Sequence, residues 1–262
     1  MSEDRTIARL WRDAVARKRP GTAYLTQHGD HWHAVSWAEA AERVERIANG
    51  LLARGVRKGD AFGLLARTTL EWSLFDFALG LVGAVGVPVY ANSSPKDVAY
   101  ILGHSEAVGV LCEDEAQRKK VESERAAMPR LQHVLEFGDL AGLEAEGAVF
   151  RDEHPTALDE AVAVIGKDTA STVIYTSGTT GPPKGCMIRH RNYYAMASVI
   201  DHLPMYVRED DLMLLYLPLA HNFGRLMHLT GAYVGYTIAF LPDPLQTADA
   251  LRRVARECAE DL

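Results

Sequence analysis

The sequence predicts an α/β protein with doubly wound, mostly parallel sheets and helices on both faces. Apolar segments of strand length alternate with amphipathic segments of helix length along most of the chain, which is typical of βαβ units. Several of the apolar segments are continuous, as in strands that helices cover on both faces. The chain has 262 residues, of which 48% are hydrophobic and 24% charged, so it can bury a sizeable core.

A short hairpin is expected near the start of the chain. Residues 23–27 and 31–35 flank His28-Gly29-Asp30 and predict two antiparallel strands. The three histidines here, His28, His31 and His33, raise the alternative of a metal site. His31 and His33 share one face of their strand, but no acidic or thiol side chain clusters with them, so we expect no metal there.

Helices and strands then alternate up to residue 137. Ser36 and Glu39 form a capping box that begins a helix, and Gly55 ends it. Ser94 and Pro95 are typical of a helix N-cap and first turn. Strands are expected at residues 61–66, 84–90, 107–112 and 133–137, with helices at residues 70–82 and 94–103 and a charged helix up to about residue 128.

A boundary between two subdomains is expected near residue 150. Residues 138–152 are rich in Gly, Glu and Ala and resemble a loop. We therefore predict an N-terminal α/β subdomain with the leading hairpin at residues 1–150. Residues 151–262 form the second subdomain, which we expect to be incomplete at its C-terminal end.

The second subdomain continues the alternation after a β-branched run that ends at Tyr175. Glu209-Asp210-Asp211 is expected to be a solvated turn. The remaining elements are short strands at residues 172–175 and 186–188, a helix from Asn192, a strand at residues 212–217, a helix up to Val234, a strand at residues 236–241 and a last helix from about Leu245.

The segment Tyr175-Thr-Ser-Gly-Thr-Thr-Gly-Pro-Pro-Lys-Gly185 is built to hold a polyanion. Glycines lack a Cβ, so backbone N–H groups can approach a ligand closely, and hydroxyls add further donors. A nucleotide polyphosphate is the commonest such ligand. The residues concerned are the hydroxyls Thr176, Ser177, Thr179 and Thr180, the glycines Gly178, Gly181 and Gly185, and the positively charged Lys184.

Two other interpretations of this segment fit its residues less well. A plain surface turn needs one or two special residues rather than this density of donors. A Walker-type loop, G-x-x-x-x-G-K-[ST], does not match, because Gly185 stands where the magnesium-binding Ser or Thr should be. A short strand is also expected after the loop, whereas a Walker loop opens directly into its helix.

The same segment resembles the signature loop of the adenylate-forming superfamily. That family includes acyl-CoA synthetases, nonribosomal peptide adenylation domains and beetle luciferases. A second resemblance lies at Leu217-Pro-Leu-Ala-His221, which is similar to the family motif whose histidine stands between the adenylate and the acyl pocket. The run that ends at Arg225 is most similar to bacterial long-chain acyl-CoA synthetases. Some fatty-acid synthetases have an aromatic gate in the neighbourhood of Arg225, so chain-length preference is not carried over.

The resemblance implies an ATP-dependent activation of a carboxylic acid, a long-chain fatty acid, as an acyl-adenylate that is transferred to coenzyme A. Lys184 and His221 would be catalytic, and Thr176 would help to bind Mg²⁺. ATP, Mg²⁺ and coenzyme A are thus the implied cofactors and co-substrates. The phosphates would be held by Thr176, Ser177, Gly178, Thr179, Thr180, Gly181 and Lys184. An amino-acid or aryl-acid adenylating enzyme and a non-catalytic partial homologue stay open as alternatives.

Other family features are absent from the sequence. These are a Tyr-Gly-x-Thr-Glu segment whose glutamate completes the Mg²⁺ site, a ribose-binding aspartate, and a small C-terminal domain with a catalytic lysine. We therefore expect the 262-residue chain alone to hold ATP phosphates weakly and to be inactive in adenylation. His190 and His228 lack support from any motif and are expected to be structural.

Composition limits the partners. The net charge of −7 and a pI near 5.8 disfavour nucleic acid, which requires a basic face. The three cysteines are widely spaced, which favours a reducing, cytoplasmic location over a disulfide framework. We expect no secretion signal and no transmembrane segment. Peripheral membrane contact and oligomerisation stay open.

Overall fold

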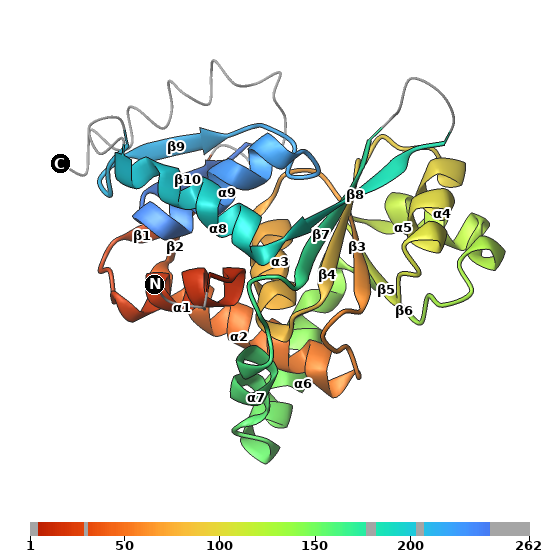
Figure 1. The fold of residues 1–262 in the computed structure, drawn as a ribbon, viewed down its shortest axis with the longest axis horizontal. Coiled ribbons are helices and arrows are strands. Elements are labelled where there is room, and N and C mark those ends of the chain that lie inside the picture. Colours follow the sequence, from red (N-terminus) through yellow and green to blue (C-terminus); the bar gives the residue numbers. More distant parts are fainter. Residues whose placement is uncertain (1–4, 29–30, 177–181, 203–206, 242–262) are drawn as a thin grey trace.

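The computed structural model describes residues 5–28, 31–176, 182–202 and 207–241, and it contains two sheets (Figure 1). In the larger sheet five strands are parallel, and the sixth, β8, runs antiparallel to its neighbour β7. Its strand order is β6 (His133–Glu136), β5 (Gly109–Cys112), β3 (Ala61–Leu65), β4 (Val85–Val89), β7 (Ala170–Thr176) and β8 (Lys184–Arg189). The predicted α/β class with mostly parallel sheets is confirmed.

The smaller sheet joins the two ends of the described chain. The leading hairpin is present as predicted, and its first strand pairs in parallel with the last described strand, Tyr24 lying opposite Ile238. The strand order is β2 (His31–Ser36), β1 (Thr22–His28), β10 (Thr237–Phe240) and β9 (Leu212–Leu215). Both sheets thus take strands from either side of residue 150, and the division into subdomains there stays a prediction.

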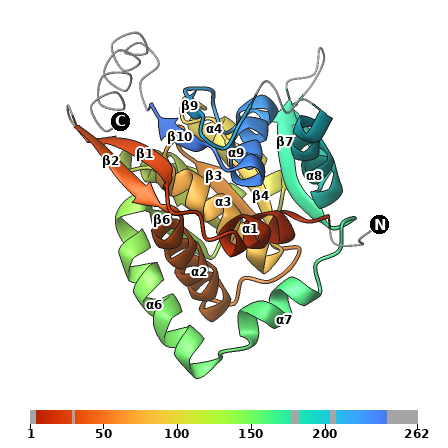
Figure 2. The ribbon, with the colours of Figure 1, turned by 90° about the vertical axis from the view of Figure 1, so that its left-hand side faces the viewer.

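Helices cover both faces of the larger sheet. Successive residues of a strand point to opposite faces, and accordingly Leu64 and Leu111 belong to one hydrophobic cluster while Leu65 and Val110 belong to another. The first cluster packs against α1 (Ile7–Ala16), α2 (Trp37–Ala53), α3 (Leu70–Val82), α6 (Leu140–Glu153) and α7 (Ala157–Ala163), and the second against α4 (Pro95–His104) and α5 (Glu115–Ser123). Figures 1 and 2 show these two groups on opposite sides of the sheet.

Helix α9 (Asn222–Val234) packs against the smaller sheet, and α8 (His190–Ser198) packs against α9 and follows directly after β8. Helix α3 is almost completely enclosed, since every one of its residues except Glu71 is buried. Thr69 caps its start by accepting a hydrogen bond from the Trp72 backbone N–H, and Gly83 ends it with a positive φ of 77°. Short 3₁₀ turns occur at Arg125–Ala127, Phe137–Asp139 and Val199–His202.

Residues 138–152 are the clearest departure from the sequence prediction, because they form helix α6 and not a loop. One of the glycines that indicated a loop, Gly147, serves close helix packing instead, together with Gly50 of α2. A Cβ on Gly147 would lie 1.9 Å from the carbonyl oxygen of Arg46, and one on Gly50 would lie 2.4 Å from that of Leu143. Glycine therefore lets α6 approach α2 more closely than any side chain would permit.

Smaller departures concern element ends and helices that no motif indicated. Helices α1 and α7 were not predicted, and α8 begins at His190 rather than at Asn192. The expected helix from Leu245 lies outside the described residues. None of the helices in the described part of the chain has the length and apolarity that crossing a bilayer requires.

Candidate active site

The predicted phosphate-binding segment lies at the end of an antiparallel hairpin formed by β7 and β8. Thr176 is in register with Lys184, and Tyr175 with Gly185. Thr176 and Lys184 are both exposed and stand across from each other where the two strands end. The other predicted phosphate-binding residues, Ser177, Gly178, Thr179, Thr180 and Gly181, lie outside the described residues.

The hairpin excludes the Walker interpretation. After a Walker loop the chain enters a helix at once, so that the helix N-terminus faces the phosphates. Here the chain returns along β8 for six residues, and helix α8 begins only at His190. A phosphate held here would contact the loop end of a two-stranded hairpin and not the start of a helix.

Packing within the hairpin requires a glycine at position 185, which the sequence did not indicate. A Cβ at this position would lie 2.8 Å from Cγ1 of Val173 and 3.3 Å from Cζ of Tyr175. The space above Gly185 is therefore filled by neighbouring side chains of β7. The missing Cβ thus serves packing within the hairpin, and its role in the close approach of a ligand stays a prediction.

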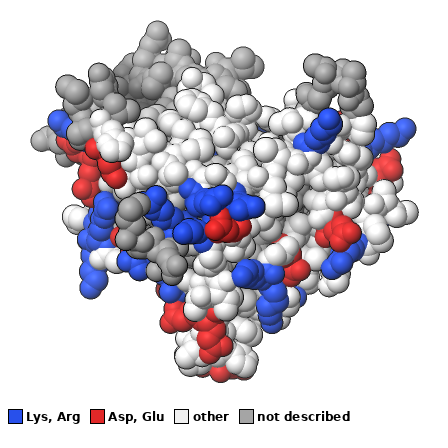
Figure 3. Space-filling model, viewed as in Figure 1, with Lys and Arg blue, Asp and Glu red and all other residues white. Residues whose placement is uncertain are grey.

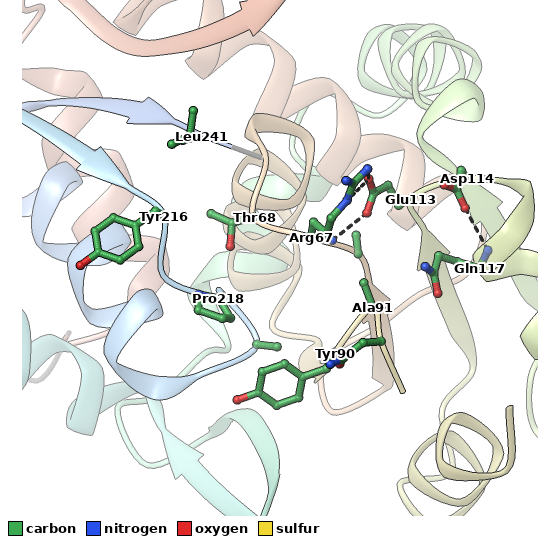
Figure 4. Close-up of a pocket in the computed structure, with 13 residues that line it drawn as sticks. Arg67, Thr68, Tyr90, Ala91, Glu113, Asp114, Gln117, Tyr216, Pro218 and Leu241 are labelled. Carbon is green, nitrogen blue, oxygen red and sulfur yellow. Dashed lines mark hydrogen bonds and ion pairs between the residues drawn. The ribbon is translucent and has the colours of Figure 1, made fainter. Parts of the chain in front are cut away.

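A cavity of about 440 Å³ opens at the carboxyl ends of strands from both sheets (Figure 4). The loops after β4 and β5 pass to the α4 and α5 face, while the loop after β3 passes to the other face. Ligands of open α/β sheets bind at such a change of direction. The lining residues are Ala66, Arg67, Thr68, Tyr90, Ala91, Asn92, Glu113, Asp114, Gln117, Tyr216, Pro218, Ala220 and Leu241.

Polar contacts fix the walls of this cavity (Figure 4). Arg67 donates from its backbone N–H and from Nε to the carboxylate of Glu113, both at 2.8 Å. The hydroxyl of Thr68 donates to the carbonyl oxygen of Leu217 at 2.8 Å and accepts from the backbone N–H of Leu219 at 3.0 Å. Thr68 therefore joins the loop after β3 to the segment after β9, which brings the two sheets together at the cavity.

Sequence reasoning missed these cavity residues. Arg67, Thr68 and Glu113 follow directly after buried strands, which places them at the carboxyl edge of the sheet. That position was the available signal. No motif marks Arg67, Thr68 or Glu113, so their position after a strand did not by itself indicate a site.

His221 lies next to the cavity wall, directly after Ala220. It is exposed and forms the N-cap of α9, where its Nδ1 accepts a hydrogen bond of 3.2 Å from the Phe223 backbone N–H. Because Nδ1 accepts, the neutral ring carries its proton on Nε2, which can donate to an oxygen of a ligand. The structure therefore places His221 at the end of the smaller sheet, whereas Thr176 and Lys184 lie at the end of the larger one.

Arg225 is buried and does not line the cavity. Its Nη2 lies 2.9 Å from Oδ1 of Asp76, and both side chains are at most 3% exposed. The guanidinium also lies over the rings of Trp72 and Tyr193, at 5.4 and 5.0 Å from their centroids. Arg225 therefore attaches α9 to α3. Some fatty-acid synthetases have an aromatic gate near this position of the sequence, but Arg225 does not line the cavity.

The two remaining histidines of this region are structural, as predicted. His228 is buried, and its Nδ1 lies 2.9 Å from the Ser73 hydroxyl; burial lowers its pKa. Nδ1 of His190 accepts a 3.2 Å hydrogen bond from the backbone N–H of Ile7. Burial, together with the charge of Arg225, lowers the pKa of His190 to about 4. Both rings are therefore neutral at pH 7.

The donors at the hairpin suit a phosphate chain better than a bare metal ion. Thr176 offers a hydroxyl and Lys184 an ammonium group, and a single hydroxyl is a small share of the six oxygens that Mg²⁺ prefers. In the described ranges no group of three or more His, Cys, Asp or Glu could hold a metal ion, and that includes the surroundings of His31 and His33. Mg²⁺ would accordingly be held largely by phosphate oxygens, with Thr176 as one protein ligand.

Charged side chains elsewhere on the surface are of both signs. Figure 3 shows a band of Lys and Arg side chains across one face, with Asp and Glu side chains beside it. Asp168, for example, pairs with both Arg189 and Arg191, at 3.2 and 2.8 Å. Such mixed charges agree with the acidic net charge of the chain.

The two-sheet α/β fold matches that of the N-terminal domains of adenylate-forming enzymes. The chain belongs to the AMP-binding enzyme family, whose model matches residues 12–260. The long-chain-fatty-acid–CoA ligase FadD15 of Mycobacterium tuberculosis is 34% identical over 218 residues, which cover 81% of this chain and 36% of that protein. This chain thus spans about one third of the length of the curated relatives that it matches.

Solved structures agree with this assignment. The inhibitor-bound N-terminal domain of FACL13 from Mycobacterium tuberculosis matches with a TM-score of 0.79 and 26% identity over 93% of this chain and 59% of that chain. Two neighbours below 25% identity show the fold alone. They are the anthranilate CoA ligase AuaEII with anthranoyl-AMP (TM-score 0.78, 23% identity, 96% and 46% coverage) and VinN with L-aspartate (TM-score 0.73, 17% identity, 89% and 61% coverage).

Proposed function

We propose that this chain takes part in the ATP-dependent activation of a long-chain fatty acid, as an acyl-adenylate for transfer to coenzyme A. The observation that carries the proposal is the β7–β8 hairpin, which presents Thr176 and Lys184 beside its connecting loop in a chain of the AMP-binding family. The fatty acid is supported by FadD15, which is named a long-chain-fatty-acid–CoA ligase and is 34% identical.

Each predicted site residue has a role in this proposal. The reaction joins two anions, since a carboxylate attacks the α-phosphate and pyrophosphate leaves, so charge neutralisation and alignment are the main tasks. Lys184 would neutralise charge on the phosphates that leave, while Ser177, Gly178, Thr179, Thr180 and Gly181 would donate to the same oxygens. His221 would donate from Nε2 to the acid or its adenylate. Mg²⁺, when bound, would supply further positive charge beside Thr176.

The cavity at the carboxyl edge is the proposed site of an organic substrate. The Arg67–Glu113 ion pair gives the cavity a polar part, and apolar side chains such as Ala66, Pro218 and Leu241 also line it. Its volume of about 440 Å³ is in the range of small-molecule sites. Activation of an amino acid or an aryl acid is the alternative, because proteins of the same fold have structures that contain L-aspartate or anthranoyl-AMP.

We propose further that the 262 residues supply the phosphate-binding part of the site and do not complete adenylation alone. The support is the coverage of only 36% of FadD15.

The two cysteines of the described residues, Cys112 and Cys186, are free, which is compatible with the cytoplasmic location that we expect.

The test is calorimetric titration of the 262-residue chain with Mg-ATP. We expect weak binding that Lys184→Ala reduces at least tenfold, because the lysine is the charged member of the predicted donor set. Lys119→Ala, at an exposed lysine on α5, is the matched control and should leave binding unchanged. Full binding by Lys184→Ala would contradict the proposal.

A second measurement tests whether the 262 residues complete adenylation alone. Acid-dependent exchange of pyrophosphate into ATP requires the adenylation step, so we expect none from the 262 residues. Robust exchange would show that the chain completes adenylation without further residues.

A further inference from the structure

Helix α4 lies against the loop end of the hairpin and is hydrogen-bonded to β7 and to the residue that precedes β8. The hydroxyl of Tyr100 donates to the carbonyl oxygen of Pro183 at 3.0 Å, and Nδ1 of His104 lies 2.8 Å from the hydroxyl of Tyr175. Pro183 directly precedes Lys184, and Tyr175 directly precedes Thr176. Each contact therefore holds the residue next to a predicted phosphate-binding side chain.

The rings of these three residues pack against one another. Tyr100 and His104 are one helical turn apart, and their rings stack with centroids 5.5 Å apart. The ring of Tyr175 meets both edge-on, at 6.2 Å and 84° to Tyr100 and at 5.7 Å and 88° to His104. Edge-to-face packing is a favoured aromatic geometry, so the ring of Tyr175 is held by two rings of α4.

Gly185 lies beside the ring of Tyr175. The two residues are in register across the hairpin, and a Cβ on Gly185 would lie 3.3 Å from Cζ of Tyr175. The Tyr175 ring thus occupies the space that a side chain on β8 would take. Both strands of the hairpin are thereby connected to helix α4.

This end of the hairpin receives little support from the sheet. Among the described residues, β7 is in register with β4 only at Thr172 and Gly86, whereas six pairs join β7 to β8 up to Thr176 and Lys184. β8 is the edge strand, and every one of its residues except Ile188 is exposed. A two-stranded hairpin alone is marginally stable in water. The contacts from α4 therefore stabilise the end of the hairpin that the sheet leaves without support.

The chemistry of Tyr175 suits this role. Its ring is half-buried, and burial, together with the nearby Tyr100 hydroxyl, raises its pKa, against a smaller opposing effect of Ser105. The phenol therefore keeps its proton at neutral pH. It can donate that proton to Nδ1 of His104, or accept one from it, and so the hydrogen bond persists in either protonation state of the imidazole.

We propose that Tyr100 and His104 form a clamp that positions the hairpin for polyphosphate binding. Both are positioning residues, since they act through Pro183 and Tyr175 on the neighbouring Lys184 and Thr176. The inference rests on the proposed function in one respect, namely that the hairpin binds the phosphates of ATP. Without the clamp, binding would also have to order the end of the hairpin, and that cost would appear as lost affinity.

The experiment compares Tyr100→Phe and His104→Leu with wild type in titrations of the 262-residue chain with Mg-ATP and with inorganic tripolyphosphate. Each variant removes one hydrogen bond, so we expect affinity for both probes to fall about 3- to 10-fold. His104→Asn places an amide where Nδ1 was and should restore affinity to within about twofold. Equal affinity of wild type, Tyr100→Phe and His104→Leu would overturn the clamp.

The matched control is Tyr236→Phe, which removes a tyrosine hydroxyl that donates to the carbonyl oxygen of Met227 at 2.6 Å beside the other sheet. It should leave affinity unchanged although it lowers the melting temperature at least as much as Tyr100→Phe. If Tyr236→Phe weakened binding equally, the effect of Tyr100→Phe would be one of general stability, and the clamp would be refuted.

Amide hydrogen exchange of the ligand-free chain separates the clamp from the proposed function. We expect Tyr100→Phe and His104→Leu to speed exchange at the strand ends of the hairpin, residues 175–176 and 184–185, and Tyr236→Phe to leave it unchanged. If wild type binds neither probe, the proposed function fails, and the exchange result alone then decides the clamp. Unchanged exchange in both α4 variants would overturn it.

Discussion

At the scale of single residues, the ion pair between Arg225 and Asp76 explains why a charged residue ends the motif at residues 217–225. Arg225 is 1% exposed, and its only ion-pair partner in the described residues is Asp76. The pair lies over Gly86 of β4, where a Cβ would meet both side chains at 3.5 Å. One helical turn before Arg225, His221 caps α9, so the pair also fixes the helix that presents His221.

Removing one partner of this pair should be far worse than removing both. Arg225→Met leaves the Asp76 carboxylate buried without its counter-charge, which should lower the free energy of unfolding by about 3–5 kcal/mol. Adding Asp76→Val should recover most of that loss, because no buried charge then remains. Urea denaturation of both variants measures the difference.

An exposed pair provides the comparison. Arg130 and Glu106 lie 3.5 Å apart with 58% and 71% exposure, so Arg130→Met should cost less than about 1 kcal/mol. A double variant of Arg225 and Asp76 as unstable as Arg225→Met alone would show that the pair is required for its hydrogen bonds and packing, not for charge compensation.

At the scale of helices and strands, α6 shows that glycine in a helix has two opposite meanings. Gly142 and Gly147 lie on the same helix, one exposed and the other buried. A Cβ on Gly142 would meet nothing within 4 Å, whereas one on Gly147 would lie 1.9 Å from the Arg46 carbonyl oxygen and 2.6 Å from the backbone nitrogen of Gly50. Only the second glycine is required by the crossing of α2 and α6.

Alanine at these two positions should therefore act in opposite directions. Gly142→Ala should raise the free energy of unfolding by up to about 1 kcal/mol, because alanine restricts the unfolded chain and favours the helix. Gly147→Ala should lower it by several times that amount, on the order of 3 kcal/mol, since backbone atoms cannot move away as a flexible side chain would. Melting temperatures of the two variants give the sign directly, and two variants of equal stability would contradict this account of the crossing.

Features that depend on interactions between residues close in sequence were predicted, whereas features that depend on residues far apart in sequence were missed. Strands and most helices were predicted because apolar periodicity and caps such as Ser94 are local signals. The phosphate-binding segment was recognised because its residues are contiguous, from Tyr175 to Gly185. The antiparallel pairing of the strands that flank it was not predicted. Helix α6 was missed because the need for Gly147 arises from a backbone about 100 residues away, at Arg46. The clamp was missed for the same reason, since Tyr100 and Pro183 are 83 residues apart.

At the scale of the whole molecule, contacts between distant segments make the described fold one cooperative unit. β1 pairs with β10, so the start and the end of the described chain share a sheet. His190 accepts a hydrogen bond from the Ile7 backbone N–H, 183 residues away, which attaches the start of α8 to the first turn of α1. The ring of His190 is fully buried, so this contact depends on a neutral imidazole.

The protonation of His190 should therefore make global stability depend on pH. The pKa of His190 is lowered to about 4 in the folded chain, mainly by burial, while an unfolded histidine has a pKa of about 6.5. Between these values the unfolded chain binds a proton that the folded chain does not, so stability falls as the pH falls from about 6.5 towards 4. From pH 7.5 to pH 5.0 this single group should remove about 2 kcal/mol. Burial lowers the pKa of His228 as well, and its contribution has the same sign.

His190→Asn isolates this effect, because an asparagine oxygen can replace Nδ1 as the acceptor for the Ile7 N–H and does not titrate. The variant should lose about 2 kcal/mol less than wild type between the two pH values in urea denaturation. His31→Asn, at an exposed histidine of β2, should behave as wild type. If His190→Asn and wild type lost equal stability between the two pH values, the pKa of His190 would not differ between the folded and the unfolded chain, and another group would account for the loss of stability in acid.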